Sequence, residues 1–194
     1  VTMIVMGSRG MGGLSGMVMG SVSASVVSHA SCPVVVVRED NHVTDSTKYG
    51  PVVVGVDGSE VSQKATAYAF REAQARGAAL IAVHTWMDMQ VQASLAGLSA
   101  AQSEWADIEK EQSELLAENL KEPREEYPDV EVKQLITRDR PVSALTEAAE
   151  GAQLLVVGSH GRGGFKGMLL GSTSRALLQS APCPMMVVRP DEDN

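Results

Sequence analysis

Short apolar runs alternate with longer amphipathic stretches between residues 51 and 190. Apart from residues 130–136, which include three polar residues, the runs are continuously apolar instead of alternating with polar residues, and this is typical of strands buried on both faces of a parallel sheet. The runs occupy residues 51–56, 79–83, 130–136, 154–157 and 185–188. They predict five strands.

Helical periodicity fills the segments between these strands. The first helix carries the apolar stripe Ala65, Tyr68, Ala69 and Ala73. We expect it to end at Gly77, because glycine readily adopts the left-handed conformation of a helix C-cap.

A longer helix is predicted to begin at a capping box formed by Ser99 and Gln102 and to end at Pro123. Its apolar face consists of Trp105, Ile108, Leu115, Leu116 and Leu120. Further helices are predicted to begin at Pro141 and Gly171. Strands that alternate with helices indicate the α/β class, with helices on both faces of a parallel sheet.

An internal repeat interrupts this simple picture. Residues 7–38 align without a gap with residues 158–189, at a constant offset of 151 residues. Six glycines, the Cys-Pro pair and a final arginine coincide in this register, which indicates a duplication.

The repeat predicts the division of the chain. Residues 1–38 are interpreted as the C-terminal fragment of a first domain that lacks roughly its first 110 residues. The polar residues 39–50 form a linker, residues 51–190 a complete domain, and residues 191–194 a tail.

Composition narrows the function classes. The net charge of −8 argues against a nucleic-acid-binding protein, which normally presents a basic face. No apolar run approaches the roughly 20 residues that cross a bilayer, and Val1 to Val5 lack the basic flank of a signal peptide. We therefore expect a cytoplasmic protein without a membrane partner. The two cysteines and four histidines show no disulfide framework and no metal-ligand spacing.

Residues 158–175 form a glycine-rich loop after the fourth predicted strand. The loop matches neither the Walker A pattern nor G-x-G-x-x-G, but it places Gly158, Gly161 and Gly171 before Ser172 and Thr173. Glycines let backbone N–H groups approach a phosphate, and hydroxyls at a helix start add donors. The segment also carries Arg162, Lys166 and Arg175 and no carboxylate. The alternative is a flexible surface loop with glycine and serine caps.

Asp57 follows the first strand of the complete domain. In parallel sheets, ligands bind at the carboxyl ends of the strands, where the strand order reverses. A carboxylate there could accept hydrogen bonds from ribose hydroxyls or reach a Mg²⁺ ion carried by phosphates. The alternative is an N-cap for the following helix.

Four motifs together resemble the universal stress protein family. They are Val54-Gly55-Val56-Asp57-Gly58-Ser59, the Arg140-Pro141 helix start, residues 155–164 with the sequence LVVGSHGRGG, and Gly171-Ser172-Thr173-Ser174. The spacing G-x₂-G-x₉-G-[ST] is similar to that of the ATP-binding branch of the family.

The resemblance implies an open five-stranded sheet of order 3-2-1-4-5, joined by a β-α-β fragment of a second copy. It implies that ATP with Mg²⁺ lies between the first and fourth strand ends. Backbone groups of Gly55, Val56 and Thr85 would then contact the adenine, and Asp57 the ribose. The loop would hold the phosphates, with nucleotide-binding positions Gly158, His160, Gly161, Arg162, Gly171, Ser172 and Thr173.

The family also pairs copies through antiparallel fifth strands. Here these strands are Val34 to Val37 and Met185 to Val188. Because the fragment 1–38 cannot close its own core, we expect a homo-oligomer in which fragments are exchanged or packed together.

The leading hypothesis is an ATP-binding regulatory protein of the stress response that is not an enzyme. An adenine-nucleotide hydrolase is the first alternative, for which Asp57 and His160 are the nearby candidate groups. An AMP or cyclic AMP binder and a structural protein without a ligand are the others.

Overall fold

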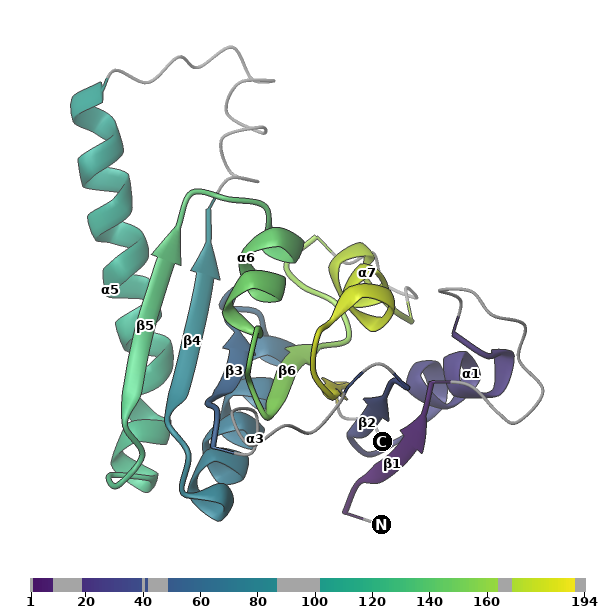
Figure 1. The fold of residues 1–194 in the computed structure, drawn as a ribbon. Coiled ribbons are helices and arrows are strands. Elements are labelled where there is room, and N and C mark those ends of the chain that lie inside the picture. The colour runs from purple at the N-terminus through teal and green to yellow at the C-terminus, as the bar shows by residue number, and fades with distance from the viewer. Residues whose placement is uncertain are drawn as a thin grey trace.

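The computed structural model describes residues 2–8, 19–39, 41, 49–86, 102–163 and 169–190 of the 194-residue chain. From residue 52 onward, strands and helices alternate along the described sequence, as Figure 1 shows. The strands are β1 (Ile4–Gly7), β2 (Val34–Val37), β3 (Val52–Gly55), β4 (Leu80–Thr85), β5 (Val132–Thr137), β6 (Leu154–Gly158) and β7 (Met185–Val188). The helices are α1 (Ser21–His29), α3 (Glu60–Arg76), α5 (Gln102–Glu126), α6 (Pro141–Ala148) and α7 (Ser172–Ser180).

These strands form one sheet of order β1-β2-β7-β6-β3-β4-β5. The five strands from β3 to β7 run parallel, and their spatial order is the predicted 3-2-1-4-5. The predicted size of the sheet was wrong, because the structure has seven strands and not five. The two additional strands join because β2 pairs antiparallel with β7, with Val35 opposite Met186, and β1 pairs parallel with β2.

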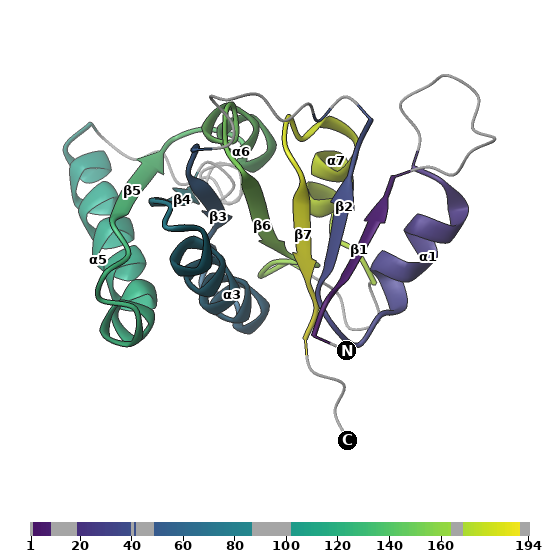
Figure 2. The same ribbon diagram turned by 60° about the horizontal axis from the view of Figure 1, so that its bottom comes forward.

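Helices cover the sheet on both faces (Figure 2). One core cluster gathers side chains of α1, α6 and α7, among them Val27, Leu145 and Leu177. The other gathers side chains of α3 and α5, among them Phe70 and Leu116. The strands β2, β3, β6 and β7 are buried between these layers, which explains their continuous apolar sequences.

The two repeated segments make equivalent hydrogen bonds at the offset of 151 residues. The Ser23 hydroxyl donates to the Gly7 carbonyl at 3.0 Å, and the Ser174 hydroxyl donates to the Gly158 carbonyl at 2.7 Å. Equivalent backbone bonds join Gly20 N to Ser8 O, Gly171 N to Ser159 O, Ile4 N to Pro33 O, and Leu155 N to Pro184 O. In the described residues, the common sequence therefore forms the same strand and the same helix start twice.

Burial differs between the two repeats. Val156 of β6 is 0% exposed, whereas Val5, at the equivalent place in β1, is 63% exposed. Val156 belongs to the cluster covered by α3 and α5. No such helix precedes β1 in the described part of the chain, so one face of this edge strand stays open.

The ends of α3 and α5 can be compared with the ends predicted from the sequence. Gly77 is the C-cap of α3 with a φ of 58°, as predicted. The predicted end of the long helix at Pro123 was wrong, since α5 continues to Glu126. Proline removes only the bond that its own nitrogen would donate, and the Pro123 carbonyl still accepts from the Tyr127 N–H at 2.9 Å. The predicted cap at Ser99 lies outside the described residues. None of the described helices is long and apolar enough to span a bilayer.

Candidate functional site

The candidate site lies where β3 and β6 end side by side at the centre of the sheet. Val54 of β3 pairs with Val156 of β6, so the residues that follow both strands emerge at the same edge. There the backbone N–H of Arg162 donates to Oδ2 of Asp57 at 3.1 Å. Residues 105 positions apart in the sequence thus meet at the predicted place.

Asp57 also organises the turn that starts α3. Its Oδ1 accepts hydrogen bonds from the backbone N–H of Ser59 at 2.9 Å and from the Ser59 hydroxyl at 2.7 Å. Ser59, and not Asp57, is the N-cap, because its Oγ accepts from the Ser62 N–H at 3.2 Å. The alternative role of Asp57 as the helix cap was therefore wrong. The carboxylate supports the cap from outside the helix and keeps Oδ2 directed at the glycine loop.

The glycines of the loop are required by close packing. A Cβ at Gly161 would overlap Oδ2 of Asp57. A Cβ at Gly158 would lie 2.9 Å from Cγ1 of Val61, and one at Gly171 would lie 3.2 Å from Cα of His160. Larger residues at these positions would push the loop away from the strand ends.

The N-terminus of α7 faces the same edge. Gly171 is its N-cap, without a side-chain cap, and Ser172 and Thr173 begin the helix, with Ser172 exposed and Thr173 half-buried. The first turn contains no acidic residue, so its N–H groups and helix dipole favour an anion. The ring of His160 lies close by, with Nδ1 at 3.0 Å from Oγ of Ser159. Lys166 lies outside the described residues.

The predicted adenine-contacting positions lie at the ends of β3 and β4. Gly55 and Thr85 are the last residues of these strands. Val56 follows Gly55, and its N–H donates to the Val83 carbonyl at 2.8 Å. The Val56 carbonyl lies 2.6 Å from Nδ1 of His84. The structure thus brings these positions to the same edge as Asp57.

His84 and Gln112 form a buried pair that sequence reasoning missed. Both side chains are 2% exposed, and Nε2 of His84 lies 2.9 Å from the Gln112 amide. A neutral ring satisfies both contacts when Nδ1–H donates to Val56 and the Gln112 amide is turned to donate to Nε2. The pair connects α5 to the strand end that precedes Asp57. No local sequence pattern predicts this pair, because the two residues are 28 positions apart on different elements.

A second missed pair lies at the ends of β4 and β5. Trp86 is 5% exposed, and the guanidinium of Arg138 lies 5.7 Å from the centre of its ring. This distance permits a cation–π interaction, which holds the residues directly after the two strands together.

This edge of the sheet offers few side chains that could bind a metal ion directly. Within the described residues, no group of three or more histidine, cysteine or acidic side chains could hold a metal ion. Asp57 fits a metal only as one carboxylate beside other ligands, such as phosphate oxygens.

The glycine positions of the first repeat have different neighbours from those of the second. Gly7, Gly20 and Ser21 hold the positions of Gly158, Gly171 and Ser172, but no described strand with an aspartate lies beside β1. Arg9 and the remaining loop glycines lie outside the described residues.

Comparison with known proteins agrees with this architecture. The model of the universal stress protein family matches residues 1–38 and 48–189. The universal stress protein Rv2005c of Mycobacterium tuberculosis is 48% identical over 187 residues, which cover 96% of this chain and 61% of that protein. Rv1996 of the same organism is 46% identical over 193 residues, which cover 100% of this chain and 60% of the relative. The chain thus spans about three fifths of the length of these curated relatives.

Solved structures give the same result. The crystal structure of a universal stress protein from Archaeoglobus fulgidus superposes with a TM-score of 0.62 at 25% identity, covering 100% of this chain and 62% of that chain. A universal stress protein crystallised in complex with cAMP has a TM-score of 0.50 at 27% identity, covering 72% of this chain and 96% of that chain. On the extent of the family match and the identity to these relatives, the chain belongs to the universal stress protein family.

Proposed function

We propose that this chain binds an adenine nucleotide, ATP with Mg²⁺, at the carboxyl ends of β3 and β6, and acts as a nucleotide-dependent regulatory protein of the stress response. The observation that carries the proposal is the hydrogen bond from the Arg162 N–H to Asp57. This bond holds the Asp57 carboxylate, which can accept a hydrogen bond from a ribose hydroxyl, directly beside a glycine loop whose N–H groups suit phosphates.

The phosphates are assigned to the loop and to the start of α7. Gly158, Gly161 and Gly171 let the backbone approach the ligand, and Ser172 and Thr173 offer hydroxyl donors at the positive end of the helix dipole. Arg162 and His160 lie in the same loop and supply further donors. In this assignment the Mg²⁺ arrives with the phosphates, and Asp57 lies within the reach of such an ion or of the ribose.

The ribose and the loop compete for Asp57. Its Oδ2 already accepts from the Arg162 N–H, and Oδ1 is engaged by Ser59. A ribose hydroxyl that donates to Oδ2 would share or replace the loop contact. Ligand binding would therefore shift the glycine loop, which gives a regulatory protein a segment whose position reports occupancy.

The base is assigned to Gly55, Val56 and Thr85. The Val56 carbonyl already lies against His84, but a carbonyl oxygen has a second lone pair for the exocyclic amino group of adenine. The similar structure in complex with cAMP, at 27% identity, supports an adenine nucleotide as the ligand class. AMP and cyclic AMP are the alternative ligands within this class.

Thermal unfolding with and without ATP and Mg²⁺ tests the proposal. Ligand at a hundredfold excess over its Kd should stabilise the fold by about 2.7 kcal/mol. The double variant Gly161→Val/Ser172→Ala should lose this shift, because a side chain at position 161 collides with Asp57. The matched control is Gly163→Val/Ser180→Ala in the same loop and helix, since a Cβ at Gly163 meets nothing within 4 Å. An equal shift in both double variants would remove the glycine loop from the site.

Turnover separates the regulatory protein from a hydrolase. We expect ATP to be recovered intact after hours of incubation. Multiple turnovers near the roughly 10 s⁻¹ of an ordinary enzyme, lost in Asp57→Asn, would instead establish the hydrolase. Parallel titrations with AMP and cyclic AMP would rank the ligands.

We also propose that residues 1–38 are the last part of a second domain copy, joined by the linker 39–50 to the complete copy 51–190. The equivalent hydrogen bonds at the offset of 151 residues support this division.

A further inference from the structure

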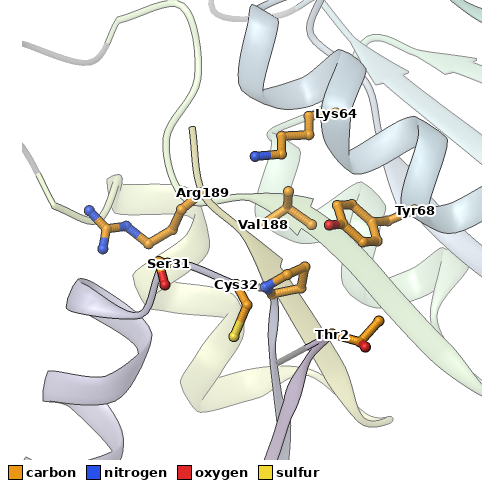
Figure 3. Close-up of a pocket in the computed structure, with 8 residues that line it drawn as sticks. Thr2, Ser31, Cys32, Lys64, Tyr68, Val188 and Arg189 are labelled. Atoms are coloured by element: carbon orange, nitrogen blue, oxygen red, sulfur yellow. The ribbon is translucent and has the colours of Figure 1, made fainter. Parts of the chain in front are cut away.

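A cavity of about 190 Å³ lies where the two repeats meet, apart from the candidate nucleotide site. As Figure 3 shows, residues of three segments line it: Thr2 before β1, Ser31 and Cys32 before β2, and Lys64 and Tyr68 of α3. Arg189, directly after β7, completes the wall. The cavity thus depends on both repeats at once.

The lining is cationic and rich in hydroxyl groups. Lys64 and Arg189 contribute two positive charges, and none of the eight lining residues is a carboxylate, although the chain carries a net charge of −8. Ser31, Thr2 and Tyr68 contribute hydroxyls that can donate to an anion. The chemistry of this wall suits an oxyanion better than a cation or an apolar molecule.

Arg189 shows a donor that the protein leaves unused. Its Nη1 donates to the carbonyl of Ala30, the C-cap of α1, at 3.3 Å, which fixes the guanidinium between the repeats. Its Nε is buried and has no hydrogen-bond partner in the described part of the chain. Buried donors of this kind normally have a hydrogen-bond partner, and leaving one unpaired is unfavourable.

We propose that this cavity binds a small oxyanion, with phosphate as its simplest representative. The anion joins Lys64 of the complete domain to Arg189 and the hydroxyls of the N-terminal segment. Binding of the anion therefore tightens the junction between β2 and β7, independently of a nucleotide at the ends of β3 and β6.

Cys32 provides a reporter inside the cavity. It is half-exposed, whereas Cys183, at the equivalent position of the second repeat, is buried. Burial raises the pKa of the Cys183 thiol to about 12. At pH 8 an alkylating reagent therefore modifies Cys32 in the native protein and leaves Cys183 intact.

The experiment measures the rate of Cys32 alkylation by iodoacetamide in the full chain, in phosphate and in chloride of equal ionic strength. We expect phosphate to slow the reaction several-fold and to saturate. Lys64→Gln and Arg189→Gln should each abolish the slowing. Lys110→Gln removes the same charge from a side chain that is 77% exposed on α5, and this control should retain the effect. Each variant serves as its own reference, since only its phosphate-to-chloride ratio is compared.

Three outcomes would overturn the proposal. One is an equal alkylation rate in phosphate and chloride for the unmodified chain. Another is undiminished slowing in both Lys64→Gln and Arg189→Gln. The last is loss of the slowing in Gly161→Val, which would assign the phosphate effect to the glycine loop. Retained slowing in Gly161→Val, with loss in the two cavity variants, supports the cavity.

Discussion

Asp57→Asn tests how the carboxylate holds the glycine loop. The asparagine oxygen can keep the place of Oδ1 and accept from the N–H and hydroxyl of Ser59, as the carboxylate does. Its amide nitrogen then stands at the place of Oδ2, where it meets the N–H of Arg162. Two donors face each other, so the substitution removes the loop contact and spares the helix cap.

The magnitude follows from the strength of that contact. Hydrogen bonds to charged groups contribute roughly 1.5–3 kcal/mol, and water replaces part of this where the contact is exposed, as here. We therefore take a value just below this range, about 1.4 kcal/mol, which corresponds to about a tenfold change in an opening equilibrium. The backbone amide of Arg162 should exchange its hydrogen about tenfold faster in the variant, whereas the amide of Ser59 should stay within about twofold of its original rate.

The assay is amide hydrogen exchange followed by NMR on the full chain. Asp139→Asn is the matched control, because Asp139 accepts from the Arg140 N–H at 2.6 Å in a different turn, between β5 and α6. It should leave the Arg162 rate unchanged. Equal Arg162 exchange in Asp57→Asn and in the unmodified chain would refute the role of Asp57 as the holder of the loop.

Three further predictions concern stability and assembly. Val156→Ala should lower the free energy of unfolding by about 2 kcal/mol in urea titrations, because two buried methyl groups are lost and a cavity remains. Val5→Ala, at the equivalent but exposed position, should cost less than about 0.5 kcal/mol, and equal losses would contradict the difference in burial. The free energy of unfolding should fall between pH 9 and 12, because the pKa of the Cys183 thiol is 9.0 in the unfolded chain and about 12 in the folded one. Cys183→Ala should remove this part of the fall. Parallel pH profiles of the variant and the unmodified chain would refute the prediction. The full chain should be a dimer or a larger oligomer, because β1 leaves an edge of the sheet unpaired. Light scattering on the full chain and on residues 46–194 measures this. A monodisperse monomer of the full chain, with residues 1–38 protected from protease, would contradict it.

Local sequence patterns predicted the elements, and the family resemblance predicted that Asp57 and the glycine loop lie at neighbouring strand ends. The strand that ends before Asp57 and the strand that ends in Gly158 could each be recognised from a short apolar run, and the family resemblance placed them side by side. Their contact through Arg162 lies at the predicted strand ends. The roles of these residues toward a nucleotide stay predictions.

Features that depend on distant partners could not be predicted in the same way. The contact between His84 and Gln112 joins a strand to a helix, and neither residue differs locally from an ordinary polar position. The antiparallel pairing of the two apolar edge strands was expected from the family resemblance, whereas an apolar edge by itself does not specify whether its partner belongs to the same chain. The structure pairs Val35 with Met186 within one chain. The helix end at Pro123 failed because proline constrains only one hydrogen bond, while the packing of Leu120 continues to hold the turn.

The antiparallel junction of β2 and β7 gives the molecule two chemically different rims. Because β1 and β2 run opposite to the other strands, Gly7 at the end of β1 lies at one rim of the sheet, and Gly158 at the end of β6 lies at the other. The second rim also carries Asp57 and the cavity beside Arg189, since β7 ends there. A partner protein that senses either of the two proposed ligands must therefore approach this rim, and a partner bound to the opposite rim contacts the sheet without covering either proposed site.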